Sequence, residues 1–118
     1  LAGGELSGKE MQRLPFFDNR LEAEALDLAL KNMQPESKAA LDELDTIALG
    51  KPTGELPPVL VIGSKKDVLF GRSALERTAA FYRASLILQD EGCHDLMLDP
   101  VREQTAREVE CWLSERKL

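Results

Sequence analysis

Two short apolar runs limit what the second half of this chain can fold into. VLVIG at 59–63 is a short apolar, β-branched run that predicts a strand buried on both faces of a sheet, and SLILQ at 85–89 is a second short run that predicts the next strand. Between them, Leu75, Ala79 and Tyr82 share one face of a helix. Two strands joined through a helix run parallel, because antiparallel strands need only a short turn. The sequence therefore predicts an α/β fold with two neighbouring parallel strands.

Two further signals predict where helices begin. Ser73 and Glu76 have the spacing of a capping box, in which both side chains satisfy backbone amides of the first helical turn. Asp99 and Pro100 fit the N-cap and the first position of a closing helix. The apolar stripe expected on that closing helix consists of Val101, Thr105, Val109, Trp112 and Leu113.

A sheet of two parallel strands leaves a physical problem. Both faces of a parallel sheet have to be covered, and two strands with two helices cannot enclose a core. Additional strands must therefore pair with these two. Residues 51–118 have the character of the last part of a larger sheet.

The first half of the chain is helical in pattern. Ser7 with Glu10 fits a capping box, and the LPFF stretch at 14–17 interrupts the helical pattern. Pro35 separates a helix expected near 19–33 from another near 36–48. Their apolar stripes are Leu21, Ala25, Leu28 and Ala29, then Ala40, Leu41, Leu44 and Ile47. We interpret these stripes as ordinary helix packing rather than a cofactor-binding surface, and GKPTGELPP at 50–58 as a connector.

Composition excludes some classes of function. The formal charge is −6, and neither half of the chain offers a basic face for nucleic acid. No apolar run approaches the roughly 18 residues of a membrane span, and the first residues lack the pattern of a secretory signal. Cys93 and Cys111 are interpreted as free thiols. We therefore expect a soluble protein, with the interior of a cell favoured and the compartment unknown.

The candidate site is an aspartate and a histidine on two loops. Asp67 lies four residues after Gly63, and His94, the only histidine in the sequence, lies five residues after Gln89. The carboxyl ends of parallel strands meet at one edge of a sheet, so the two side chains can come within hydrogen-bond reach. A histidine whose tautomer is fixed by a carboxylate is a general base for a weak nucleophile. Acid first and histidine later is also the chain order of α/β-hydrolases.

Each of these residues has an alternative role. A lone histidine is commonly a surface or packing residue, and an aspartate after a strand commonly stabilises a turn. Cys93, beside the histidine, is a candidate thiol nucleophile, but the side chains of adjacent residues on one loop seldom point at the same substrate atom. The nearby acids do not have the pattern of a transition-metal site, so neither a metal nor a cofactor is expected. They are Asp90, Glu91, Asp95 and Asp99.

The segments PPVLVIGSKKDVLF, TAAFYRA, GCHDLMLDP and VECWL together resemble the C-terminal part of an α/β-hydrolase of the esterase and lipase type. The resemblance covers 57–118 well and 7–49 more loosely. It implies a helical cap or lid at 1–50 and the last part of the hydrolase core at 51–118. It also implies that Asp67 is the acid and His94 the histidine of a Ser-Asp-His triad.

The chain departs from that family at the nucleophile. The sequence contains no G-x-S-x-G motif, and neither Ser64 nor Ser73 has the flanking glycines. The serine and the oxyanion hole would then come from a preceding N-terminal half or from another chain. If they are present, the resemblance implies a carboxylic-ester hydrolase that acts on a small acyl ester, with hydrolysis of a thioester or an amide as the alternatives. One alternative is a non-catalytic hydrolase-like subunit or remnant with a role in assembly, and a second is a free-standing small helical module.

Overall fold

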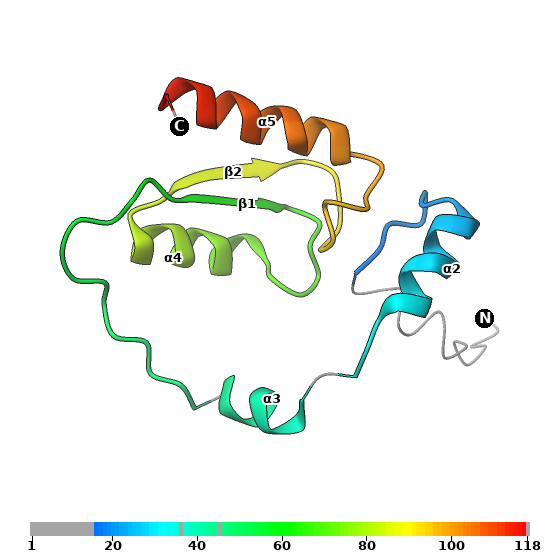
Figure 1. Cartoon of the computed structure of the whole chain (residues 1–118), viewed down its shortest axis with the longest axis horizontal. Coiled ribbons are helices and arrows are strands. Elements are labelled where there is room, and N and C mark those ends of the chain that lie inside the picture. The colour runs from blue at the N-terminus through cyan, green and yellow to red at the C-terminus, as the bar shows by residue number, and fades with distance from the viewer. Residues whose placement is uncertain (1–15, 36, 45, 118) are drawn as a thin grey trace.

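The computed structural model describes residues 16–117 except 36 and 45. Its elements in chain order are α2 (Ala23–Asn32), α3 (Lys38–Leu44), β1 (Leu60–Ser64), α4 (Arg72–Tyr82), β2 (Ser85–Gln89) and α5 (Arg102–Glu115). β1 and β2 form a parallel pair in which Leu60 lies opposite Ser85 and Ser64 opposite Gln89. The expected α/β class, with two neighbouring parallel strands, is confirmed (Figure 1).

The two helices of the second half lie on opposite sides of the strand pair (Figure 1). α4 approaches β1 closely, since a Cβ at Gly63 would come within 2.5 Å of Cδ1 of Leu75. α5 is joined to β2 by polar side chains. Thr105 donates to Oε1 of Gln89 at 3.1 Å, and Nε2 of Gln89 donates to Glu108 at 2.7 Å.

The expectation that the first strand is buried along its length on both faces is wrong. Only Gly63 and Ser64 are buried in β1, and only Gln89 is buried in β2. Among the described residues each strand has a neighbour on one side alone, and each face of the pair is covered by one helix. Leu113, on the expected apolar stripe of α5, is also exposed.

The prediction of a capping box at the start of α4 is also wrong. The helix begins at Arg72, its N-cap is Gly71, and no side chain caps it. Oγ of Ser73 accepts a hydrogen bond from Arg77 at 2.6 Å, and Glu76 pairs with Arg72 at 2.6 Å. Both acceptors are thus bound by arginine side chains one turn away instead of by backbone amides.

The closing helix begins two residues later than expected. Pro100 lies in a turn, and α5 starts at Arg102 with Val101 as its N-cap. Asp99 still accepts a hydrogen bond from a backbone amide, because its Oδ1 lies 2.9 Å from N of Val101. The aspartate therefore stabilises the turn that leads into the helix.

The helices of the first half are shorter than predicted and poorly covered. Neither α2 nor α3 has a buried residue, and Leu28 and Leu44 are 61% and 67% exposed. We expected the apolar stripes of these helices to pack against the rest of the protein, but within the described part of the chain they are not buried. The helix α3 also stands away from the sheet (Figure 1). Ser7 and Glu10 lie outside the described residues.

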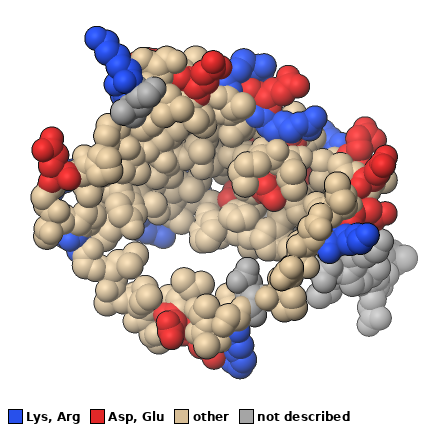
Figure 2. All heavy atoms as spheres, viewed as in Figure 1, with Lys and Arg blue, Asp and Glu red and all other residues tan. Residues whose placement is uncertain are grey.

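Charged side chains are spread around the edge of the face drawn in Figure 2, which is otherwise largely uncharged. Among the described residues, the buried apolar side chains are those of Phe17, Ala79 and Leu96. No described helix combines the length and the apolar character that crossing a membrane requires.

Candidate active site

Asp67 and His94 are in contact. Nδ1 of His94 lies 3.0 Å from Oδ2 of Asp67, and the two residues stand on the loops that follow β1 and β2. The two strands are adjacent and parallel, so both loops leave the sheet at the same edge. The structure therefore brings the two sequence-predicted residues together.

The Asp67 carboxylate is held from both of its oxygens. Oδ1 accepts hydrogen bonds from N of Leu69 at 2.8 Å and from N of Phe70 at 3.0 Å, while Oδ2 faces the imidazole. The aspartate thus stabilises a turn and orients the histidine at the same time. Its side chain is only 6% exposed, compared with 29% for His94.

These contacts set the ionisation of Asp67. Burial alone would raise its pKa, but the hydrogen bonds from His94, Phe70 and Leu69 outweigh burial and hold the pKa below its usual value of 3.8. A carboxylate facing Nδ1 makes Nδ1 the protonated nitrogen of a neutral imidazole. Nε2 then carries the lone pair, and no described residue is hydrogen-bonded to it.

Two phenylalanine rings flank the imidazole. The ring of Phe16 lies 5.7 Å from that of His94 in an edge-on arrangement, and the ring of Phe70 lies 5.3 Å away. Phe70 follows Asp67 in the acid loop, whereas Phe16 comes from the first half of the chain. The backbone carbonyl of Phe16 accepts a hydrogen bond from N of Asp95 at 3.0 Å, so this segment is fixed against the histidine loop.

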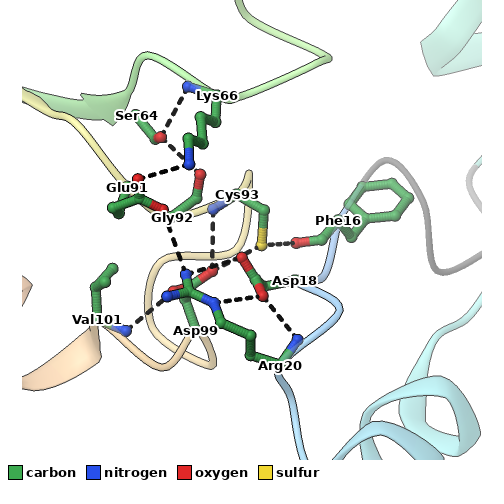
Figure 3. Close-up of polar contacts among 10 residues, drawn as sticks. All are labelled: Phe16, Asp18, Arg20, Ser64, Lys66, Glu91, Gly92, Cys93, Asp99 and Val101. Atoms are coloured by element: carbon green, nitrogen blue, oxygen red, sulfur yellow. Dashed lines mark hydrogen bonds and ion pairs between the residues drawn. The ribbon is translucent and has the colours of Figure 1, made fainter.

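The acid loop and the histidine loop are joined by a buried hydrogen bond. Ser64, at the end of β1, is fully buried and donates its hydroxyl to O of Gly92 at 2.6 Å (Figure 3). The same oxygen accepts a hydrogen bond from N of Lys66 at 3.0 Å. Sequence reasoning considered Ser64 only as a possible nucleophile and missed this role.

Two ion pairs span the same loops at the surface. Lys65 pairs with Asp90, and Nζ of Lys66 lies 2.6 Å from Glu91. The sequence did contain a signal for this, because two lysines follow the first strand and two acids follow the second. In a parallel pair those positions lie side by side.

Cys93 is not set up as a nucleophile. Its Sγ lies 2.9 Å from O of Phe16 and 3.0 Å from Oδ2 of Asp99, and its backbone N donates to the same carboxylate (Figure 3). Burial, the hydrogen bond to Asp99 and the charge of Asp99 raise the pKa of Cys93 to about 12. A neutral thiol is a poor nucleophile. Cys93 and Cys111 are both free, as expected.

The acidic residues around the histidine contact different partners and do not form one cluster. Asp90 and Glu91 pair with lysines, Asp99 holds Cys93 and the turn before α5, and Asp95 lines a groove beside α2. Within the described residues, no group of three or more His, Cys, Asp or Glu side chains could hold a metal ion.

None of the described serines is hydrogen-bonded to His94. Ser64 uses its hydroxyl in the buried bond to Gly92, and Ser73 and Ser85 accept hydrogen bonds from arginines. The described residues therefore supply an acid and a base without a nucleophile beside them. No protein-family model, curated protein or solved structure matches this chain at a significant level.

Proposed function

We propose that Asp67 and His94 are the acid and the base of a serine-hydrolase triad in a protein of the α/β-hydrolase type. The observation that carries this proposal is the 3.0 Å contact between Nδ1 and Oδ2 at one edge of two parallel strands. The chain order, with the acid before the histidine, supports it as well. The serine and the oxyanion donors would lie outside this sequence, in a preceding segment or another chain.

The geometry suits acyl transfer. Nε2 of His94 takes the hydroxyl proton of the serine as the serine oxygen forms a bond to the carbonyl carbon of an ester. Collapse of the tetrahedral intermediate breaks the bond to the leaving alkoxide, which receives that proton from His94. Water then attacks the acyl-enzyme by the same route and releases the acid. Asp67 stabilises the imidazolium at each step, and the rings of Phe16 and Phe70 pack against the imidazole.

Labelling of the native assembly with a serine-reactive fluorophosphonate tests the proposal. We expect the wild type to be labelled and His94→Ala to be labelled about 10³-fold more slowly, since the serine loses its base. Asp67→Asn should slow labelling by a similar factor because it favours the wrong tautomer. Asp90→Asn, which removes only an exposed ion pair from the same loop, is the matched control and should leave the rate unchanged.

Two results would overturn the proposal. One is a wild-type assembly that is not labelled at all. The other is a labelling rate that His94→Ala does not change, because the labelled serine would then act without this histidine.

Exposed apolar side chains favour a second candidate, a non-catalytic subunit. Val68 and Phe70, in the acid loop, are 72% and 52% exposed, and further exposed apolar residues follow α3. Large exposed apolar surfaces commonly mark contacts with another protein. An assembly that forms, stays unlabelled and is disrupted by Val68→Asp would support this candidate in place of the hydrolase.

A further inference from the structure

Segment 16–20, which we call the strap, contacts the loop that carries His94 at two points. At the start of the strap, the carbonyl oxygen of Phe16 accepts hydrogen bonds from Sγ of Cys93 at 2.9 Å and from N of Asp95 at 3.0 Å. Cys93 and Asp95 are the residues directly before and after His94. The strap therefore holds the loop on both sides of the histidine.

The other end of the strap is joined to the same loop by charge. Oδ1 of Asp18 accepts hydrogen bonds from N and Nε of Arg20, at 2.7 and 2.8 Å. Nη2 of Arg20 lies 3.7 Å from Oε2 of Glu91 (Figure 3). Exposed ion pairs contribute little alone, whereas Phe17, between the two contacts, is buried. The hydrogen bonds of Phe16 and the burial of Phe17 are thus the main attachment of the strap.

The orientation of the imidazole depends on more than its contact with Asp67. A single hydrogen bond from Nδ1 leaves rotation about the Cβ–Cγ bond open, because this torsion has broad minima. Half a turn would take Nδ1 away from the carboxylate. The ring of Phe16 meets the imidazole edge-on, at 65° and 5.7 Å between centroids, and the ring of Phe70 lies 5.3 Å away. Packing of this kind opposes the rotation.

We propose that Phe16 is a positioning residue for His94, whose ring, fixed by the strap, holds the imidazole with Nδ1 toward Asp67. The orientation itself does not depend on the reaction. Its value for acyl transfer rests on the proposed function, because it directs Nε2 only if His94 is a base. The strap also leads into α2, so the first half of the chain acts on the proposed base by direct contact.

The orientation can be observed by NMR, because His94 is the only histidine of the chain. The full chain is labelled with ¹⁵N at histidine and measured at about pH 8, where an ordinary imidazole is neutral. We expect two well-separated ring nitrogen signals with the proton on Nδ1, and NOEs between the rings of Phe16 and His94. In Phe16→Leu the Nδ1 proton should exchange with water about 10-fold faster, and the nitrogen signals should move toward each other.

Two further variants separate positioning from a general effect on the fold. Phe16→Tyr keeps the ring and should restore the wild-type signals. Phe81→Leu is the matched control, because Phe81 is also half-buried but packs on Tyr82, at 4.9 Å between ring centroids. It should leave the signals of His94 unchanged. The NOEs need no variant, so they decide the question even if Phe16→Leu does not fold.

Fluorophosphonate labelling of the native assembly distinguishes this inference from the proposed function. If both hold, Phe16→Leu should slow labelling about 10-fold, much less than His94→Ala, and Phe81→Leu should not slow it. If the wild type is not labelled but the NMR differences are found, the hydrolase proposal is wrong and the positioning of His94 by Phe16 stands.

The inference is overturned if the wild type shows no NOE between the two rings, or if Phe16→Leu leaves the signals of His94 as unchanged as Phe81→Leu does. It is equally overturned if labelling requires His94 but Phe16→Leu is labelled as fast as the wild type. In that case the hydrolase proposal stands without it.

Discussion

The hydroxyl of Ser64 donates to the carbonyl of Gly92 across 2.6 Å, and both residues are buried. Ser64 stands three residues before Asp67, and Gly92 stands two residues before His94. The relative position of the acid and the base is therefore fixed by a buried hydrogen bond at the end of the sheet. The ion pairs of Lys65 and Lys66 span the same loops, but they are exposed, and exposed pairs contribute little to stability.

Replacing Ser64 with alanine tests this arrangement. Ser64→Ala leaves the carbonyl of Gly92 and the amide of Lys66 without their partner, so we expect it to lower the free energy of unfolding by about 1–3 kcal/mol. Urea denaturation measures this change. Ser73→Ala, on the exposed side of α4, is the control and should change stability by no more than about 0.5 kcal/mol. Equal effects of the two variants would contradict the structural role of Ser64.

Gly92 should tolerate no side chain. Its φ of +105° is one that residues with a Cβ rarely adopt, and a Cβ there would lie 2.7 Å from Cδ2 of Leu96. We expect Gly92→Ala to cost about 1–3 kcal/mol of unfolding free energy and to shift the NMR signals of the His94 ring. Gly50→Ala is the matched control, because a Cβ at Gly50 meets only open space. A Gly92→Ala protein as stable as Gly50→Ala would show that the loop has other conformations open to it.

Local pattern predicted part of this fold. The two strands were found from their aliphatic runs, SLILQ with its observed bounds, and parallel pairing followed from the helix between them. The contact between Asp67 and His94 then followed from where parallel strands end. These features depend on residues close in sequence and on one topological rule, so the sequence was sufficient for them.

Other features depend on competition or on distant partners. The predicted capping box of α4 does not form, because arginines one turn away bind Ser73 and Glu76. The spacing of a serine and a glutamate does not show that such competing partners are present. The contact of Cys93 with Phe16 joins residues 77 positions apart. Phe16 was seen in the sequence only as part of a stretch that interrupts a helix, so its packing on His94 could not be predicted.

The stability of the protein should depend on the ionisation of Asp67. Its pKa in the folded state is below the usual value, so Asp67 contributes stability above the unfolded pKa, and the contribution is lost as the pH falls through the lower folded pKa. From about pH 4 downward, the unfolding free energy of the wild type should therefore fall more steeply than that of Asp67→Asn. Urea denaturation at a series of pH values measures the difference.

A salt series distinguishes this buried contact from surface charge. The pKa of Asp90 is also lowered, by its exposed hydrogen bond and ion pair with Lys65. At about 0.5 M NaCl the pH-dependent difference between the wild type and Asp90→Asn should shrink, because salt screens exposed charges. The difference for Asp67→Asn should persist. If it disappears as well, the contact with His94 is not the source of the lowered pKa.

The two thiols should differ in reactivity. Cys93 has a pKa raised to about 12 by burial and by Asp99, so at pH 8 only about 10⁻⁴ of it is thiolate, whereas Cys111 is exposed. We expect iodoacetamide to modify Cys111 and to spare Cys93 in the folded protein, and to modify both in urea, as peptide mass spectrometry would show. Asp99→Asn should speed the modification of Cys93, because it removes the charge that disfavours the thiolate. If native Cys93 is modified as fast as in urea, its pKa is not raised by burial and Asp99. A thiolate nucleophile beside His94 would then be a candidate again.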